Sequence, residues 1–496
     1  MSPRPPVIVE EVRSVSDGGV HRGSEEADSA PLGCLWLRCY PSRTEARARS
    51  QAGALVLRLD DDFWALRVGL CGIYRHMNFM PLLLSLFAQA DGLSLGPFLG
   101  HVDHHRAFVW VRASSPGTLL LKAGEQGQEL NLRVEGVAEV ENDLTVSFEL
   151  NGLTPGSDWD FQILKGEEEL GAGSFQTAPA LDTPSKVRIA FGSCASDSKF
   201  PELKTFSQVL KTSCDSLVFL GDTPYIDSTD LAVQRRRYRE FLGHPAVSGV
   251  LSRVPAWSTW DDHDFGKNDT DGRMKGKENS RRAHLEYHAG PPAGDGAAGI
   301  YRSFRRGPVE VFLIDARWFA ATEPAEADPE KHTLLGAAQW EWLRAGLKSS
   351  TAHFKLLTTG MIWNESVRPM KSDHWGNYPH EREQLFRFIG EEGISGVVLI
   401  GGDIHRTRVV RHDVEALTGY PLIELISSPM ANSVIGSAKQ PHPGLIYDVG
   451  NSQTFMSFEA DSTAQTPHWT ARFLDHEGVE LFRISRSLAE LSTPPK

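Results

Sequence analysis

Acidic, thiol, phenol and imidazole side chains follow the ends of four apolar runs beyond residue 185 of this 496-residue chain. The runs are typical of buried strands, and in open α/β sheets ligands bind outside the carboxyl ends of the strands. The four groups are therefore expected to meet at one edge of a sheet. They are Cys194 after "VRIAFG", Asp222 and Tyr225 after "SLVFLG", Asp261, Asp262 and His263 after "AWSTW", and Asp403 and His405 after "GVVLIG".

Each of these residues alone has a commoner explanation. An aspartate after a strand, such as Asp222, often caps the next helix, and a lone cysteine such as Cys194 is usually a small buried hydrophobe. Together, however, several carboxylates at one sheet edge repel each other strongly in a low dielectric unless cations lie among them. Thiolate, phenolate and imidazole ligands favour trivalent iron, whereas all-oxygen positions suit calcium, manganese or magnesium. The residue types therefore predict a mixed pair of metal ions.

The elements that must position these residues change in character along the chain. Residues 91–182 contain short runs of alternating hydrophobicity separated by turn signals, which predicts a small antiparallel β-sandwich. Residues 183–496 alternate apolar strands with longer helical patterns and predict an α/β domain. Residues 1–90 are left unassigned. Within them, 77–90 ("MNFMPLLLSLFAQA") resembles a secretory h-region, or is an ordinary apolar segment leading into the first domain.

Composition excludes several classes of function. The net charge of −13 provides no broad basic face, so a nucleic-acid scaffold is not an expected partner. The five cysteines form no CxxC pair and no evenly spaced framework, so neither a zinc knuckle nor a disulfide scaffold is indicated. No apolar run reaches the length of a transmembrane helix. The protein is expected in the periplasm or outside the cell if 77–90 is a signal peptide, and in the cytoplasm otherwise.

Six segments together resemble the alkaline phosphatase D (PhoD-like) metallophosphatases: "IAFGSC", "FLGDTPYID", "TWDDHDFGKND", "LGAAQWEWL", "SDHWGNYPHER" and "GGDIH". The resemblance extends from about Leu95 to about residue 487. It implies an α/β fold class, with a calcineurin-like metallophosphoesterase β-sandwich core flanked by helices. A small all-β fibronectin III/Ig-like sandwich would precede this core. The "GDTPY" segment also matches the Gly-Asp-x-x-Tyr motif of purple acid phosphatases, which share that core.

The resemblance also implies roles for individual residues. It places Fe³⁺ on Cys194, Asp222, Tyr225 and His405. It places a second metal, Ca²⁺ or another divalent ion, on Asp222, on Asp262 or its neighbour Asp261, and on Asp403. His263 would lie beside the scissile phosphate, and Asn268 would touch metal or phosphate. The Asp-x-His opening of the wider superfamily is absent, and its middle histidine has no clear equivalent, with Asn364 and His374 as the candidates.

The expected activity is hydrolysis of small-molecule phosphate esters, either monoesters or diesters. A metal-activated hydroxide would attack phosphorus in line with the leaving alkoxide, with His263 and Asp262 as the catalytic residues. The alternative is a catalytically inactive metal domain and sandwich that bind a surface. Three further motifs have alternative explanations. "GLSLG" (92–96) matches a serine nucleophile motif but is favoured as chance, and Arg235 to Arg237 as a phosphate cradle is less favoured than a solvated helix face. For "HVDHH" (101–105), a metal site and an exposed strand of the sandwich explain the sequence equally well.

Overall fold

The computed structural model describes residues 92–494 of the chain. The segment 77–90, which resembles a secretory h-region, lies outside these described residues, as does the rest of 1–90. Within the described part, no helix combines the length and the apolar character needed to cross a membrane.

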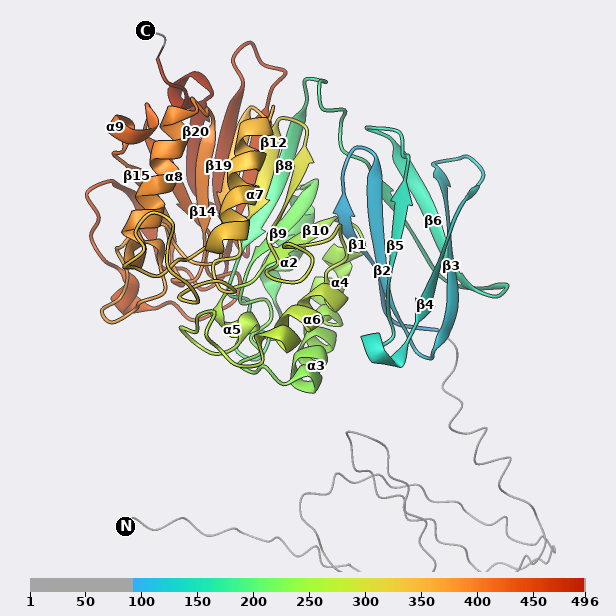
Figure 1. The fold of residues 1–496 in the computed structure, drawn as a ribbon. Helices are drawn as coiled ribbons and strands as arrows, with labels where there is room; N and C mark the ends of the chain where they lie inside the picture. The colour runs from blue at the N-terminus through green and yellow to red at the C-terminus, as the bar shows by residue number, and fades with distance from the viewer. Residues whose placement is uncertain (1–91, 495–496) are drawn as a thin grey trace, which may run out of the picture. The chain divides into compact units, whose positions relative to one another are not determined.

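Two antiparallel sheets built from residues 93–176 form a β-sandwich (Figure 1). Along the strand Thr145–Asn151, buried Val146, Phe148 and Leu150 alternate with more exposed neighbours, which is the pattern of a strand with one covered face. The buried side chains of both sheets share one hydrophobic cluster. One sheet has the order β1 (Leu93–Val102), β2 (Arg106–Ala113), β5 (Thr145–Asn151), and the other β4 (Leu132–Ala138), β3 (Gly117–Glu125), β6 (Asp158–Lys165), β7 (Glu168–Gln176).

Two larger sheets follow in the chain. The six-stranded sheet has the order β10 (Ala256–Thr259), β9 (Ser216–Leu220), β8 (Lys186–Gly192), β18 (Thr454–Asp461), β19 (His468–Asp475), β20 (Glu480–Ser487). The seven-stranded sheet has the order β11 (Arg302–Arg306), β12 (Val309–Leu313), β13 (Phe354–Thr358), β14 (Val397–Gly401), β16 (Leu422–Ile426), β15 (Thr407–His412), β17 (Leu445–Val449). In both sheets the strands nearest the polar clusters, β8 to β10 and β12 to β14, pair in parallel.

Alternate side chains of β8 and β9 pack in two different hydrophobic clusters, one on each face of the sheet. Ile189, Phe191 and Val218 lie in a core that also contains side chains of the seven-stranded sheet. Leu217 and Phe219, on the other face of β9, pack in a second cluster with helices. Complete burial of each such side chain contributes about 1.5–3 kcal/mol, so a polar substitution on either face would be costly.

Helices cover the outer faces of both sheets (Figure 1). Those of the second cluster are α2 (Lys204–Lys211), α3 (Leu231–Leu242), α4 (Pro245–Leu251) and α6 (Lys277–Tyr287), and those beside the seven-stranded sheet are α7 (Gly336–Ser349) and α8 (Pro379–Glu391). The remaining short helices are α5 (Asp262–Phe265), α9 (Glu415–Thr418), η1 (Val140–Asn142), η2 (Trp375–Asn377), η3 (Gly436–Ala438) and η4 (Ala489–Leu491).

Side chains of the sandwich contact helices α3 and α6. The indole Nε1 of Trp110 donates to the carbonyl oxygen of Glu286 at 2.8 Å. Asp143 accepts hydrogen bonds from Arg112 at 3.0 Å, from Arg239 of α3 at 2.8 Å and from the Tyr287 hydroxyl of α6. Burial would raise the pKa of Asp143, but these three donors outweigh it and lower that pKa. The sandwich and the helices are therefore held by a charged contact as well as by apolar packing.

The three other motifs have structural roles. Ser94 of "GLSLG" lies in β1, where its hydroxyl donates to the carbonyl oxygen of Arg112 at 3.1 Å. His101 of "HVDHH" was expected on an exposed strand, but it is only 2% exposed and is hydrogen-bonded to Asp103 at 2.9 Å and to Trp257 at 3.1 Å. That expectation was wrong because the sandwich strand β1 is covered by the larger domain. In the arginine run, Arg235 and Arg237 pair with Glu286 and Asp197.

Two stacked histidines near the end of α6 have pKa values depressed by burial. Their rings lie 4.2 Å apart, and His288 Nδ1 lies 3.0 Å from the carbonyl oxygen of His284. Burial lowers the pKa of His284 well below its usual value and lowers the pKa of His288 to about 4. Both imidazoles are therefore neutral in the folded protein at neutral pH.

Acidification should destabilise the protein through these histidines. Between about pH 6.5 and about 4 the unfolded chain binds protons that the folded imidazoles do not, so stability falls as pH falls. His288→Gln removes one such group, and the loss on going from pH 7 to about pH 4.5 should be smaller by roughly 2–3 kcal/mol. Urea unfolding at both pH values measures it, with His468→Gln on β19 as the control. Equal losses in wild type and His288→Gln would contradict this account.

Candidate metal centre

The four polar groups predicted from the sequence come together at the carboxyl ends of β8, β9, β10 and β14. Cys194 follows β8, Asp222 follows β9, and Asp262 begins α5 directly after β10. Ligand-type atoms of these residues and of His263, Asp403 and His405 form overlapping groups in which all atoms lie within 4.8 Å of one another. Three of these groups are Cys194 with Asp222 and His405, Asp222 with Asp262 and His263, and Asp261 with Asp262 and Asp403.

The backbone is strained at four of these positions. Cys194, Asp222, Asp403 and His405 all have φ between 51° and 67°, in the left-handed region. Such conformations are uncommon for residues other than glycine, cost on the order of 1 kcal/mol or more each, and cluster at functional sites. Gly221 allows the turn before Asp222, because it has a φ of +92° and a Cβ there would lie 2.3 Å from the Asp261 nitrogen. The strained turns direct all four side chains toward one place.

A thiol, a carboxylate, a phenol and an imidazole converge at one side of the site, which we call the inner side. They belong to Cys194, Asp222, Tyr225 and His405. The Cys194 Sγ lies 3.4 Å from Asp222 Oδ2 and 3.3 Å from the Ser428 hydroxyl. The Tyr225 hydroxyl lies 2.9 Å from His405 Nε2. Burial and the neighbouring Asp222 carboxylate raise the pKa values of both Cys194 and Tyr225. A bound cation would oppose those shifts, because it stabilises the deprotonated forms.

The orientation of His405 suits a ligand. Its Nδ1 lies 2.7 Å from the carbonyl oxygen of Ser433, which can only accept, so Nδ1 carries the proton and Nε2 presents a lone pair toward Tyr225. Burial lowers the pKa of His405 to about 4, which keeps the ring neutral. A second hydrogen bond of this kind commonly fixes the tautomer of metal-binding histidines.

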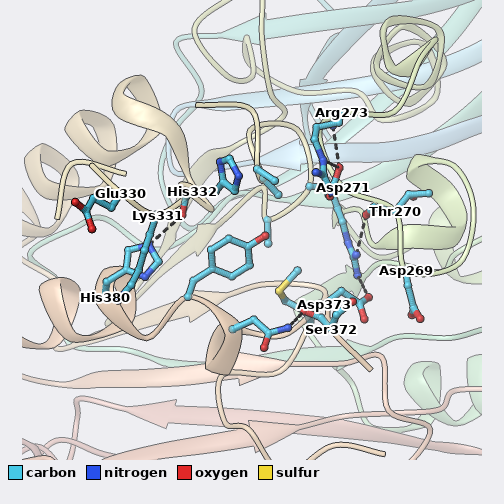
Figure 2. A pocket seen from close by; sticks show the side chains of 17 residues that line it. Asp269, Thr270, Asp271, Arg273, Glu330, Lys331, His332, Ser372, Asp373 and His380 are labelled. Carbon is cyan, nitrogen blue, oxygen red and sulfur yellow. Dashed lines mark hydrogen bonds and ion pairs between the residues drawn. The ribbon is translucent and has the colours of Figure 1, made fainter. Parts of the chain in front are cut away.

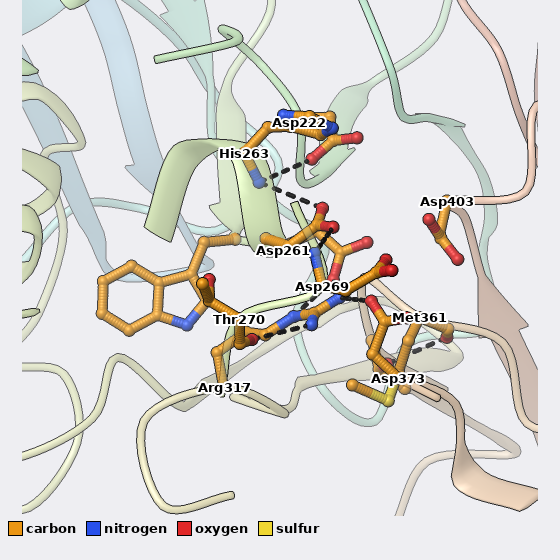
Figure 3. A network of polar contacts seen from close by, with 12 residues as sticks. Asp222, Asp261, His263, Asp269, Thr270, Arg317, Met361, Asp373 and Asp403 are labelled. Carbon is orange, nitrogen blue, oxygen red and sulfur yellow. Dashed lines mark hydrogen bonds and ion pairs between the residues drawn. The ribbon is translucent and has the colours of Figure 1, made fainter. Parts of the chain in front are cut away.

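Buried carboxylates make up the rest of the site (Figure 3). Asp222, Asp261 and Asp262 are 1–2% exposed and Asp403 is 8% exposed. Burial raises the pKa of Asp222 well above its usual value, and repulsion from Asp262 raises it further. Burial also raises the pKa of Asp403 to about 7, against the opposing effect of Lys371. The Oδ2 atom of Asp261 has no hydrogen-bond partner among the described residues. The negative charge of these buried carboxylates, together with the nearby thiol, phenol and imidazole, fits a site for metal cations.

His263 lies beside these carboxylates, and Asp227 contacts its ring. Its backbone N–H donates to Asp222 at 3.3 Å and to Asp262 at 3.0 Å, and its Nδ1 lies 2.6 Å from Asp227 Oδ1. Burial would lower the pKa of His263, but the hydrogen bond to Asp227 and the charges of Asp222 and Asp262 raise it to about 9. The imidazolium is therefore favoured at neutral pH as long as no cation compensates the charges of Asp222 and Asp262.

Comparison with known proteins identifies the family. Residues 189–490, more than half of the chain, match the family model described as PhoD-like phosphatase. The chain belongs to the PhoD-like phosphatase family. Residues 90–176 match a different model, described as a domain of unknown function, DUF7800. The family predicted from the sequence is thus confirmed.

Individual relatives of this PhoD-like phosphatase agree with the family. The alkaline phosphatase D of Bacillus subtilis (strain 168) is 26% identical over 313 residues, which is 53% of this chain and 53% of the relative. The match thus spans about half the length of that curated relative. A solved structure of PhoD has a TM-score of 0.68 at 18% identity, covering 82% of this chain and 92% of that one.

A second solved structure extends the fold similarity. The purple acid phosphatase isolated from yellow lupin (Lupinus luteus) seeds has a TM-score of 0.60 at 12% identity, covering 79% of this chain and 74% of that one. These likenesses confirm the predicted fold class, a calcineurin-like metallophosphatase core of two sheets with flanking helices.

Other predicted residues of the PhoD-like phosphatase lie at the margin of the site or away from it. Asp261 contributes an oxygen to the carboxylate group, but its other oxygen, Oδ1, accepts from Arg317 Nε at 2.8 Å. Asn268 lines a small cavity at the site. Asn364 is held in a buried network, donating to Glu424 at 2.8 Å and accepting from Ser366 at 2.8 Å. His374 belongs to none of the converging groups among the described residues.

Several residues at the site were not predicted from the sequence. Asp269 lies in "TWDDHDFGKND" and Asp373 in "SDHWGNYPHER", so both motifs contained a signal that was not assigned to the site. Asp269 and Asp373 form a fourth converging group with Asp262. Lys371 and Arg317 contact these carboxylates from loops. Lys371 directly precedes "SDHWGNYPHER" and Arg317 closely follows β12, but neither residue was assigned to the site.

Two cavities adjoin the carboxylates. The smaller, of about 60 Å³, is lined by Asp222, His263, Asn268, Arg368, Lys371, Asp403, Ile404, His405, Ile435 and Ala438. The larger, of about 480 Å³, lies on the side of Asp269, Arg317 and Asp373 and extends to His332, Tyr378 and His380 (Figure 2). The smaller cavity is the one bordered by the converging ligand atoms, so we take it as the centre of the site.

Metal removal should destabilise the PhoD-like phosphatase, because buried carboxylates are left without compensating charge. Cations at hundredfold excess over their Kd would stabilise the fold by about 3 kcal/mol, or several degrees in Tm. Asp222→Asn should reduce the difference in Tm between metal-free and metal-loaded protein. Glu202→Gln, an exposed carboxylate on the surface, is the matched control. A metal-free wild type with unchanged Tm in scanning calorimetry would refute the electrostatic argument.

Proposed function

We propose that this protein is a metal-dependent phosphoric ester hydrolase that acts on small-molecule phosphate monoesters or diesters. One observation supports this proposal above the others: a thiol, a phenol, an imidazole and several carboxylates converge at the ends of four strands in a PhoD-like fold. Residues 183–496 would form the catalytic domain and 91–182 a separate sandwich, a division that stays a prediction.

The donor set supports one ferric and one divalent ion. Cys194, Asp222, Tyr225 and His405 would hold Fe³⁺, because thiolate and phenolate ligands favour a trivalent ion. Asp222, Asp262 and Asp403 would hold Ca²⁺ or another divalent cation, with Asp261 as a further contact. When bound, such cations lower the pKa of a coordinated water and neutralise phosphoryl oxygens.

His263 would act on the substrate itself. Its Nδ1 is engaged by Asp227, which leaves Nε2 as the nitrogen that can donate to a phosphate oxygen or to the departing alkoxide. Asp227 is a positioning residue, since it holds the ring and favours the protonated form. Arg368 and Asn268 line the same small cavity and would bind the other phosphoryl oxygens.

The size of that cavity bears on the substrate. Ligand pockets that enclose a drug-sized molecule usually measure about 300–1,000 Å³. The cavity beside His263 measures about 60 Å³, which is enough for little more than a phosphoryl group. The rest of the substrate would therefore extend outside it.

Kinetics of His263 variants test the proposal. His263→Gln should lower kcat by about 10²–10⁴-fold, because the proton donor is lost while the metal ligands remain. Asp227→Asn should lower kcat by a smaller factor, about 10–100-fold, with unchanged metal content. Hydrolysis of a chromogenic phosphomonoester and diester, with and without chelator, is the assay.

Two outcomes of that assay would reject the proposal. Metal-loaded wild type that hydrolyses neither ester would favour the alternative of a non-catalytic surface-binding protein. Full activity after complete metal removal would exclude the metal-dependent mechanism. Asp230→Asn, at the start of α3, is the matched control for Asp227→Asn because it changes a nearby carboxylate that caps a helix.

The ferric assignment has its own test. A tyrosinate bound to Fe³⁺ absorbs visible light, so the purified protein should be coloured and contain about one iron per chain. Tyr225→Phe should lose the band, whereas Tyr238→Phe, a buried tyrosine of α3, should keep it. Absorption spectra and elemental analysis provide the measurement. A colourless, iron-free and fully active wild type would contradict the assignment of iron.

A further inference from the structure

Lys371 lies among the outer carboxylates of the site, which are Asp269 and Asp373. The Nζ of Lys371 is 3.1 Å from Asp269 Oδ1, 2.8 Å from Asp373 Oδ1 and 3.0 Å from Asp403 Oδ2. Its side chain is only 3% exposed, so water contributes little to its solvation. Three carboxylates therefore surround one ammonium group at ion-pair distances. The contact with Asp269 is also a hydrogen bond, whereas Asp373 Oδ1 and Asp403 Oδ2 have no hydrogen-bond partner among the described residues.

Arg317 supplies a second fixed cation on the same side. Its Nη2 lies 2.8 Å from Asp373 Oδ2, and its Nε lies 2.8 Å from Asp261 Oδ1. The guanidinium is 1% exposed, and its Nη1 donates to the carbonyl oxygen of Thr270 at 3.0 Å. The outer carboxylates Asp269 and Asp373 thus already have positively charged partners. Lys371 contacts both, Arg317 contacts Asp373 (Figure 3), and Arg368 Nη2 lies 3.6 Å from Asp269 Oδ1.

The inner carboxylates differ in this respect. Within residues 92–494, Asp222 and Asp262 form no ion pair with a lysine or an arginine, and their nearest polar partners are the thiol of Cys194 and backbone N–H groups. By geometry alone, however, Asp262, Asp269 and Asp373 also present three oxygens within 4.8 Å of one another, as a metal site would. Asp403 is shared between the two groups, because it pairs with Lys371 and also lies with Asp261 and Asp262. Asp269 and Asp373 differ from Asp222 and Asp262 in that Lys371 contacts both of them directly.

We propose that Lys371 is a built-in cation that closes the outer carboxylate group to metal and so confines the metal ions of this protein to the inner donors. An ammonium group that already contacts Asp269, Asp373 and Asp403 occupies the space between their oxygens and repels a divalent ion brought close to it. This inference rests on the proposed function, because it takes the inner donors as the sites of the bound ions.

Removing the ammonium group tests the proposal through metal content. Lys371→Met keeps an unbranched side chain, one atom shorter, but leaves Asp269 and Asp373 with one cation fewer. Full-length protein equilibrated with excess Ca²⁺ and passed through gel filtration should then contain one more divalent ion per chain than wild type. Plasma mass spectrometry of the eluted protein measures the ratio. The double variant Lys371→Met/Asp373→Asn lacks a ligand of the new site and should return to the wild-type ratio.

Single carboxylate variants provide a second test in which the buried lysine remains in place. Asp269→Asn should leave the metal content of the protein unchanged, because Asp269 binds Lys371 and not metal. Asp262→Asn is the matched control and should lose one divalent ion. If Asp269→Asn loses an ion, or if Lys371→Met folds and gains none, the proposal is wrong. A Lys371→Met protein that folds only with Ca²⁺ present supports it, because the ion then replaces the ammonium.

The iron content distinguishes this proposal from the function on which it rests. One iron in wild type and in Lys371→Met, with an additional divalent ion only in the variant, supports both. An additional divalent ion in the variant with no iron in either protein supports the role of Lys371 and overturns the ferric assignment. Unchanged divalent content in a folded variant, with iron present in both, overturns the role of Lys371 alone.

Discussion

Repulsion among buried carboxylates is the constraint on which the rest of this structure depends. Asp222, Asp261, Asp262 and Asp403 come from three strand ends and lie together with almost no exposure to solvent. A protein interior cannot stabilise such a group of like charges without positive partners. The outer part of the cluster has Lys371 and Arg317, and for the inner part the donor set is that of a metal site. Basic side chains thus compensate one part of the carboxylate cluster, and the donors of the other part are suited to metal ions.

The β-sheets make this arrangement possible because they fix where the strands end. Parallel pairing of β8, β9 and β10 brings the residues after each strand to the same edge. The turns after β8, β9 and β14 then adopt left-handed backbone conformations at Cys194, Asp222 and Asp403. Large apolar cores on both faces of the sheets supply the free energy that maintains these unfavourable turns.

Much of the inner site could be predicted from the sequence, because strand ends and residue types carry that information locally. Cys194, Asp222 and His405 each follow an apolar run, and the order of the motifs indicated the family. Lys371 and Arg317 could not be predicted in the same way. They reach the carboxylates from irregular segments, and a single lysine or arginine in a loop usually faces solvent. Their role depends on tertiary packing that leaves no periodic pattern.

The sandwich shows a related limit. Its alternating strands were evident from the sequence, but the burial of His101 was not, since alternation does not reveal which strand face another domain will cover. The sequence also did not show the tertiary contacts of Asn364 and His374, the two candidates for the superfamily's middle histidine. Asn364 is absorbed in a hydrogen-bond network with Glu424, a partner some 60 residues away in the chain.

The contact between the sandwich and helix α3 has a mechanical consequence for the candidate site. Asp143 of the sandwich accepts a hydrogen bond from Arg239 of α3 at 2.8 Å, and two residues earlier Arg237 donates to the carbonyl oxygen of Tyr225 at 3.1 Å. The same helix therefore joins an anchor in the small domain to the loop that carries the phenol. Without residues 92–180 the helix would keep its apolar packing through Tyr238, Phe241 and Leu242 but would lose the Asp143 anchor, so the loop that carries the phenol would be less firmly held.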